Sequence, residues 1–186
     1  MSKNLYRVAN LRGFDNKTDE KRLKFCIISR NNSCERFDWE IGRYIETLDV
    51  NGAIYDELKT MFKDHIISVD NAIARVENIR LEDGELLCEC VFDESSTTIY
   101  ERFKNGILND VSIGYRVIES EISKKDNKNY VLVTKFEILE LSAVWKGADK
   151  GANLRNKNDI EKIQRAKEYM DLQKEILNLK EKTLWN

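Results

Sequence analysis

The sequence predicts an α+β fold in which strands dominate and only a few helices accompany them. Runs of alternating apolar and polar residues, typical of strands, recur through residues 1–152. The chain contains no proline, so its turns depend on Gly, Asn and Asp. From residue 153 onward glycine is absent and dense alternating charges surround regularly spaced apolar residues. We therefore expect a strand-rich domain over residues 1–152 and a charged amphipathic helical tail over residues 153–186.

The composition excludes several classes of partner. A chain of 186 residues suits one domain with an appendage, and its net charge of −2 gives no bulk attraction to nucleic acid or to an anionic membrane. No apolar run approaches the length of a membrane span, and the opening residues MSKNLYRVAN lack the apolar core of a signal peptide. We expect a cytosolic protein that binds neither nucleic acid nor membrane.

The cysteines and the single histidine argue against a metal centre. Cys26, Cys34, Cys88 and Cys90 form no CxxC pair, and one histidine cannot complete a zinc set with them. We expect four reduced thiols, no metal and no cofactor. If an imidazole performs acid–base chemistry here, it is His65.

In the first half of the chain the pattern predicts a strand, a turn and a helix. Residues 22–29 read as a strand, and residues 30–38 read as turn-rich. Residues 52–64 are predicted to form a helix that ends just before His65. This helix is inferred from apolar residues near helical spacing, namely Ile54, Leu58, Met61 and Phe62.

The second half begins with a hairpin and a helix. Residues 73–92 form two alternating runs whose turn contains Gly84. Residues 96–108 read as a helix with a serine N-cap and with Gly106 just past its end.

Two long strands follow, over residues 110–122 and 130–145, joined by the polar turn 123–129. Within the first strand the small residues Ser112 and Gly114 share the face opposite the apolar residues. A small pair of this kind leaves room for another chain to approach the strand backbone.

The helical tail has two interpretations. Its mixture of charges and apolar residues suits a terminal helix packed on the domain. It equally suits a segment that binds a partner or is removed by cleavage.

Three residue types needed for nucleophilic catalysis occur in order along the chain. A serine hydroxyl is a weak nucleophile until a base accepts its proton, and the base must be oriented by a third group. Ser112 offers the hydroxyl, His65 the base, and Glu137 or Glu140 the orienting carboxylate. These types occur together in most chains, so spacing alone supports the idea only weakly.

An ordered set of motifs strengthens the hypothesis. The segments DVNGAIYDELKTMFKDH, IARVENIRLEDGELLCECVFDES, LNDVSIGYRV and EILELSAVWKGADKGA together resemble the prohead serine proteases of tailed bacteriophages, a family related in fold to the herpesvirus assemblins. The resemblance covers roughly residues 37–152. It implies a mainly antiparallel β-barrel core surrounded by a few helices.

The resemblance also implies roles for single residues. His65 corresponds to the general base and Ser112 to the nucleophile. Glu137 and Glu140 are three residues apart, so on a regular strand they face opposite sides and only one can reach His65. We favour Glu137 as the orienting group and keep Glu140, which belongs to an E-x-S-x-V motif, as the alternative.

Two further residues border the expected site. Gly114 would let the substrate backbone approach the strand. Lys146 would assist an oxyanion electrostatically, or would simply be a solvated surface lysine.

The function implied by the resemblance is endoproteolysis during capsid maturation. Its substrates would be a scaffold protein or the scaffolding segment of the major capsid protein, and the chain itself, inside procapsids assembling in the bacterial cytoplasm. A homodimer is compatible with this interpretation. The alternatives are a non-enzymatic capsid-assembly or scaffold-like protein on the same fold, and a generic β-barrel binding module.

Overall fold

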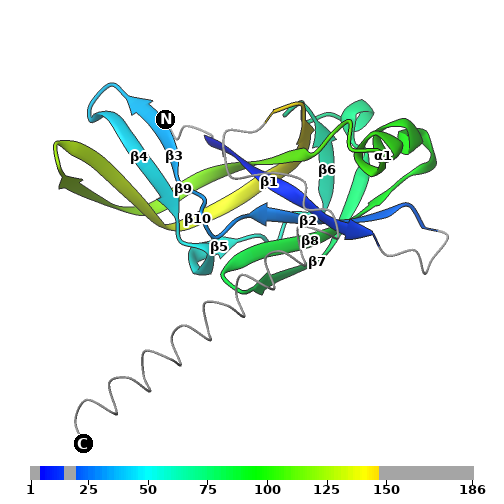
Figure 1. Ribbon diagram of the computed structural model, residues 1–186, viewed down its shortest axis with the longest axis horizontal. Helices are drawn as coiled ribbons and strands as arrows, with labels where there is room; N and C mark the ends of the chain where they lie inside the picture. Colours follow the sequence, from blue (N-terminus) through cyan, green and yellow to red (C-terminus); the bar gives the residue numbers. More distant parts are fainter. Residues whose placement is uncertain (1–4, 15–19, 147–186) are drawn as a thin grey trace, which may run out of the picture. The chain divides into compact units, whose positions relative to one another are not determined.

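The computed structural model describes residues 5–14 and 20–146, and within these ranges it contains one large sheet (Figure 1). The expected helical tail and the last residues of the expected domain lie outside the described residues. The strands are β1 Leu5–Phe14, β2 Arg22–Ile28, β3 Cys34–Asp38, β4 Gly42–Leu48, β5 Ala53–Ile54, β6 Thr60–Lys63, β7 Ala74–Glu82, β8 Glu85–Phe92, β9 Asp110–Lys125 and β10 Lys128–Val144. The helices are α1 Thr97–Lys104 and the short 3₁₀ turns η1 Val50–Gly52, η2 Val69–Asn71 and η3 Glu94–Ser96.

The strand pairings form a path that returns to its starting point. The neighbours run β10, β6, β7, β8, β2, β1 and β9, and β9 pairs again with β10. The sheet therefore curls around a core, as the predicted barrel requires. Most of the strand pairs are antiparallel, whereas β10 runs parallel to β4, β5 and β6, an arrangement that the sequence did not predict.

A long hairpin of β9 and β10 extends from this curled sheet (Figure 1). β4 pairs with the early part of β10, and β3 pairs with β4 on its other side. The later part of β10 enters the ring, where Leu141 pairs with Met61 of β6 and Ile113 of β9. One strand thus joins the extension to the ring.

The core lies inside the curl. Tyr115, Phe25, Phe103 and Phe136 are among its largest fully buried side chains. Phe103 anchors α1 by an edge-to-face contact with Phe25, with the ring centroids 5.2 Å apart. Burying such aromatic side chains contributes roughly 1.5–3 kcal/mol each.

The helix predicted over residues 52–64 was wrong. Those residues form η1, β5, a turn and β6. Met61 is fully buried between β10 and β7, because it pairs with Leu141 on one side and Ala74 on the other. Tertiary pairing therefore outweighed a local pattern that also fitted a helix. The segment expected to be turn-rich likewise contains β3.

Other local predictions are confirmed. The hairpin of β7 and β8 turns at Asp83 and Gly84, which both have positive φ. α1 begins after Ser96 and is followed by Gly106 at a φ of 71°. The long strands β9 and β10 occupy the two segments predicted for them, with their turn at Asp126 and Asn127.

All four cysteines are buried free thiols, as predicted. Burial raises the pKa of the Cys90 thiol, and its contact with Cys88, at a sulfur–sulfur distance of 3.9 Å, raises it further. Cys90 therefore stays protonated near neutral pH.

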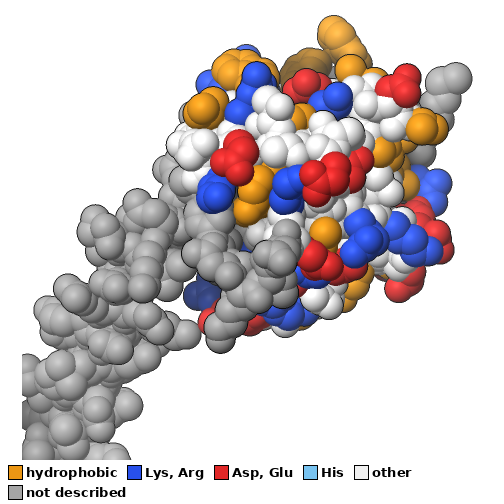
Figure 2. Space-filling model, turned by 90° about the vertical axis from the view of Figure 1, so that its right-hand side faces the viewer, with side chains coloured by type: hydrophobic (Ala, Val, Ile, Leu, Met, Phe, Trp, Pro, Cys, Tyr) orange, Lys and Arg blue, Asp and Glu red, His pale blue; other side chains and the backbone are white. Residues whose placement is uncertain are grey.

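Acidic and basic side chains are interspersed on the molecular face drawn in Figure 2. That face offers no patch of a single charge sign of the kind that binds nucleic acid. Among the described residues, no helix combines the length and the apolar character needed to cross a membrane.

Candidate active site

His65 lies in a tight turn directly after β6. Asp64 and His65 have φ angles of 50° and 60°, and the Ile66 amide donates to the carbonyl of Lys63 at 2.9 Å. Two successive residues of positive φ define a type I′ turn. The Asp64 amide also donates to Ala143 of β10 at 3.0 Å, which fixes the turn against that strand.

A β-bulge in β10 determines which side chains face His65. Ile138 pairs with Tyr115 of β9, but the next paired residue is Glu140, opposite Gly114. Leu139 is therefore the extra residue of the bulge. Beyond it, Ser142 lies directly opposite Ser112.

The bulge also changes the expected relation between the two carboxylates. Glu137 pairs with Arg116 and Glu140 pairs with Gly114, so both glutamates lie opposite residues on the same face of β9. The expectation that they face opposite sides assumed a regular strand and was wrong. The two glutamates therefore differ in their position along β10 and not in the face of the sheet on which they lie.

Glu140 connects His65 to Ser142. His65 Nδ1 lies 2.7 Å from Glu140 Oε1, and Ser142 Oγ donates to Glu140 Oε2 at 2.5 Å. Glu140 is 1% exposed and Ser142 is fully buried, whereas the His65 side chain is 25% exposed. The carboxylate is thus enclosed, and its cluster reaches solvent through the imidazole.

Glu137, the carboxylate that we favoured, forms a different ion pair. It binds the guanidinium of Arg116, its cross-strand partner on β9. The carboxylate that contacts His65 is Glu140, the alternative kept in the sequence analysis.

Ser112 is held between two strands rather than on a solvated face. It pairs with Ser142 on one side and with Val8 of β1 on the other. It is 3% exposed, and Val111 and Ile113 beside it are fully buried. Paired residues of antiparallel strands project to the same side of the sheet, so Ser112 shares a face with the Ser142–Glu140 pair. Gly114, opposite Glu140, leaves that position without a side chain.

Lys146 is exposed, and its ammonium lies 6.0 Å from the centroid of the Trp145 ring. The loop that follows Lys146 lies outside the described residues.

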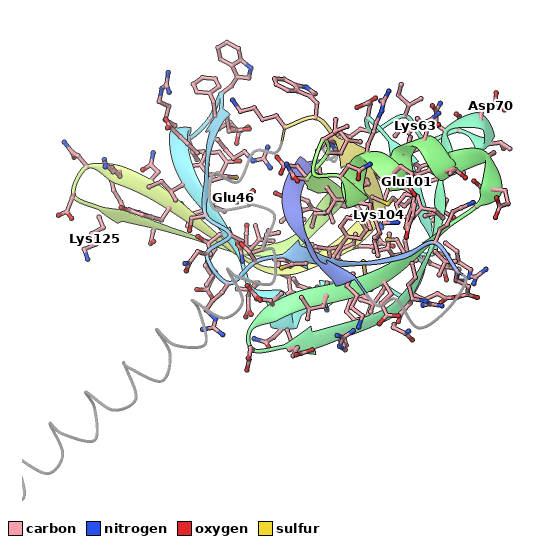
Figure 3. All side chains as sticks on the ribbon, turned by 45° about the vertical axis from the view of Figure 1, so that its right-hand side comes forward. Glu46, Lys63, Asp70, Glu101, Lys104 and Lys125 are labelled. Atoms are coloured by element: carbon pink, nitrogen blue, oxygen red, sulfur yellow. The ribbon has the colours of Figure 1, made fainter. Side chains whose placement is uncertain are left out.

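Figure 3 shows Lys63, two residues before His65, at the same end of the molecule as Glu101 and Lys104 of α1, whereas Lys125 lies at the tip of the β9–β10 hairpin.

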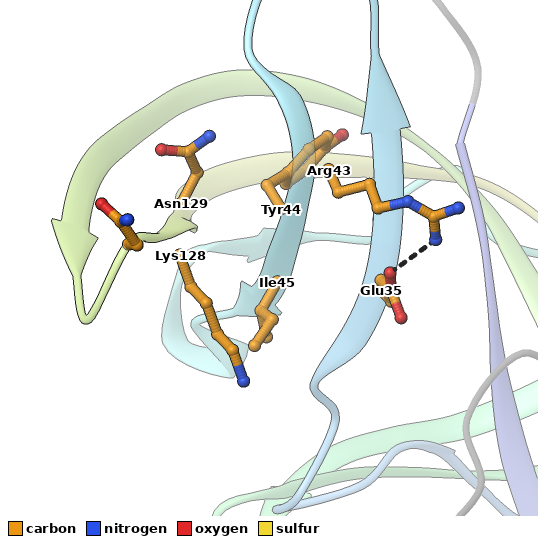
Figure 4. Close-up of a pocket in the computed structure, with 7 residues that line it drawn as sticks. Glu35, Arg43, Tyr44, Ile45, Lys128 and Asn129 are labelled. Atoms are coloured by element: carbon orange, nitrogen blue, oxygen red, sulfur yellow. Dashed lines mark hydrogen bonds and ion pairs between the residues drawn. The ribbon is translucent and has the colours of Figure 1, made fainter.

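A pocket at the far end of the extension contains none of these site residues. It has a volume of about 290 Å³ and is lined by Glu35, Arg43, Tyr44, Ile45, Asn127, Lys128 and Asn129 (Figure 4). Ser142 follows Lys128 by 14 residues (142−128) along β10. The pocket is therefore remote from His65 and Ser112.

Ser142 was not among the residues expected to act in the site. The signal was its spacing from Glu140, because residues two apart on a strand share a face. A hydroxyl at that position can reach the carboxylate.

Comparisons with known proteins show a similarity over part of the chain. The model of the family described as caudovirus prohead serine protease matches residues 87–166. Among solved structures, the bacteriophage T4 capsid assembly protease, gp21, aligns with a TM-score of 0.43 and 11% identity, over 77% of this chain and 98% of that one. No curated protein matches the chain. The segment matched by this family model includes Ser112, Glu140 and Ser142, and its sequence is therefore similar to that of the caudovirus prohead serine proteases.

Proposed function

We propose that the protein is a serine endopeptidase in which Ser112 is the nucleophile, His65 the general base and Glu140 the group that orients the base. The observation that carries the proposal is the 2.7 Å contact between His65 Nδ1 and Glu140 Oε1, on the sheet face that Ser112 shares. His65 lies outside the segment matched by the family model, so this contact supports the triad independently of that match.

For acyl transfer we propose the following proton movements. Glu140 accepts a hydrogen bond from the Nδ1–H of His65 and keeps its charge, so proton exchange with Ser112 is assigned to Nε2. As Ser112 Oγ bonds to the scissile carbonyl carbon, its proton passes to Nε2. The imidazolium then gives that proton to the leaving amine as the peptide bond breaks. A water molecule, deprotonated by His65, hydrolyses the acyl-enzyme and regenerates the Ser112 hydroxyl.

The family description indicates the biological substrate. A prohead protease acts during capsid assembly, so we propose that this chain cleaves a scaffold protein or the scaffolding segment of the major capsid protein within procapsids. Self-cleavage in or near residues 153–186 would belong to the same activity. Lys146 remains a candidate for oxyanion stabilisation.

Intact-mass spectrometry combined with a fluorophosphonate probe tests the proposal without knowledge of the substrate. We expect the wild-type protein to gain one phosphonyl group at Ser112 and to shorten with time. Ser112→Ala and His65→Ala should do neither. Ser120→Ala is the matched control, because Ser120 is an exposed serine on the same strand, and it should behave as the wild type.

Two results would contradict the proposal. One is labelling that persists in Ser112→Ala. The other is a wild-type protein that is neither labelled nor shortened, even with a coexpressed capsid protein. The non-enzymatic capsid-assembly alternative would then be favoured.

A further inference from the structure

We propose that Ser142 is a positioning residue of the protease, which holds the second oxygen of Glu140 so that the first oxygen orients His65. This inference rests on the proposed function, because it assigns Ser142 a part in the same site. Ser142 belongs to the reaction through Glu140 and not through contact with substrate.

The two oxygens of Glu140 have separate partners. Oε1 contacts His65 Nδ1 at 2.7 Å, and Oε2 accepts the Ser142 hydroxyl at 2.5 Å. The terminal torsion of a glutamate is soft, with broad minima. A single hydrogen bond would leave that torsion poorly defined, whereas two bonds on different oxygens fix the plane of the carboxylate. The plane of the carboxylate in turn sets the orientation of the imidazole.

Burial leaves the Ser142 hydroxyl in the place of a water molecule at Glu140 Oε2. A carboxylate that is 1% exposed has lost nearly all of its water, and an ionised group in such a place requires hydrogen bonds to its charged form. Ser142 is fully buried, so bulk water cannot take its place without a rearrangement of β10. A short hydroxyl–carboxylate distance is typical of a charge-assisted hydrogen bond.

The direction of this hydrogen bond also excludes a second role for Ser142. A serine hydroxyl has one proton, and a carboxylate can only accept. Since Ser142 donates its proton to Glu140, its oxygen can only accept from Ser112, its cross-strand neighbour. A hydroxyl of ordinary acidity is a poor general base, so the proton of Ser112 still has to reach His65.

The first readout is the rate at which the fluorophosphonate labels Ser112. Losing a hydrogen bond to a buried charged group should slow labelling of Ser142→Ala by roughly 10- to 100-fold. Ser142→Thr keeps a hydroxyl. Ser142→Val introduces a side chain of nearly the same shape as threonine, but without the hydroxyl. If Ser142→Ala folds poorly, the Thr and Val variants together isolate the effect of the hydroxyl. At equal thermal stability, the fluorophosphonate should label Ser112 at least tenfold faster in Ser142→Thr than in Ser142→Val.

The second readout does not depend on catalysis. The chain has one histidine, so every imidazole resonance of the ¹⁵N-histidine-labelled protein belongs to His65. We expect a downfield Nδ1–H proton in the wild type, retained in Ser142→Thr. In Ser142→Ala and Ser142→Val this proton should move upfield and exchange faster with water. Glu140→Gln should also change it, which confirms the assignment to the His65–Glu140 contact.

The two readouts separate the possible failures. If Ser142→Ala and Ser142→Val keep the wild-type labelling rate and the wild-type His65 resonance, Ser142 is not a positioning residue, although the proposed protease still stands. If the wild type is never labelled, the proposed function fails, and the His65 resonance alone decides whether Ser142 orders Glu140. A slower rate with an unchanged resonance would also contradict the positioning role.

Discussion

We expect the proposed chemistry of the cluster to depend on Glu140. Removing one partner from a buried, hydrogen-bonded charge is far more costly than the same change at the surface. Glu140 is enclosed between His65 and Ser142, whereas Glu137 pairs with Arg116 at a partly exposed position. The same substitution at these two glutamates should therefore have different effects.

Glu140→Gln should slow fluorophosphonate labelling of Ser112 by on the order of 10³-fold, because an amide does not stabilise the imidazolium and can favour the wrong His65 tautomer. Glu137→Gln is the matched control and should keep the wild-type rate within about twofold. The measurement is the second-order labelling rate at fixed pH. A larger loss in Glu137→Gln than in Glu140→Gln would restore Glu137 as the orienting carboxylate.

A second residue-scale prediction concerns Asn32, which is 3% exposed. Its amide side chain accepts from the Leu48 amide at 2.8 Å and donates to the Leu48 carbonyl at 3.0 Å, as a neighbouring strand would. Asn32→Ala leaves both buried groups unpaired, so the free energy of unfolding should fall by about 2–4 kcal/mol. Urea denaturation measures this change. Asn51→Ala, at an exposed position, should change it by less than about 0.5 kcal/mol.

At the scale of elements, η1 lies unusually close to β10. A Cβ atom at Gly52 would lie 1.8 Å from the carbonyl oxygen of Thr134, which is backbone and cannot rotate away. Gly52 therefore permits the approach of two backbones, and its conformation requires no positive φ.

Gly52→Ala should lower the free energy of unfolding by about 3 kcal/mol or more, because η1 must move away from β10. Gly42→Ala provides the comparison. Gly42 has a φ of 73°, but a Cβ atom added there would meet no other atom within 4 Å, so its cost is backbone strain of about 1 kcal/mol. Chemical denaturation of both variants measures the difference. Equal losses would mean that the η1–β10 contact is looser than described.

Elements with strong local signals could be predicted from the sequence. The β7–β8 hairpin has Gly84 at its turn, and α1 has Gly106 after its end. β6 could not be predicted, because its strand conformation comes from pairing with β10 and β7, which are distant in sequence. Local spacing of apolar residues carries no information about such pairing.

The sequence named candidate residues for the site but could not give its register. His65 and Ser112 were chosen from the motifs, and their catalytic roles stay predictions; the structure adds the contact of His65 with Glu140. Which glutamate contacts His65 depends on the bulge at Leu139, and no local sequence pattern predicts that bulge. The same bulge brings Ser142 opposite Ser112, whereas the contact of Ser142 with Glu140 needs only their two-residue spacing, a signal that was available in the sequence.

At the scale of the whole molecule, the sheet depends on contacts between distant parts of the chain. Ser142 pairs with Phe62, 80 residues earlier (142−62), and β1 pairs with β9. Such contacts form late in folding because long loops must close first. We therefore expect refolding in milliseconds to seconds rather than microseconds.

Refolding should also lack a proline-limited phase. The 186 residues contain no proline, so no X–Pro bond can isomerise in the unfolded state over tens of seconds. In a double-jump experiment, refolding amplitudes should not change with the time spent unfolded between about 1 and 300 s. A slow phase that grows over this interval would require another source of unfolded-state heterogeneity.

The parallel pairing of β6 with β10 has a consequence for protein synthesis. His65 leaves the ribosome long before Glu140 and Ser142, because β10 is the last described strand. A nascent chain therefore contains the imidazole and the Ser112 hydroxyl while Glu140 and Ser142, the groups proposed to position them, have yet to be translated. We expect hydrolytic activity to appear only after β10 emerges, so that the order of translation itself would delay proteolysis.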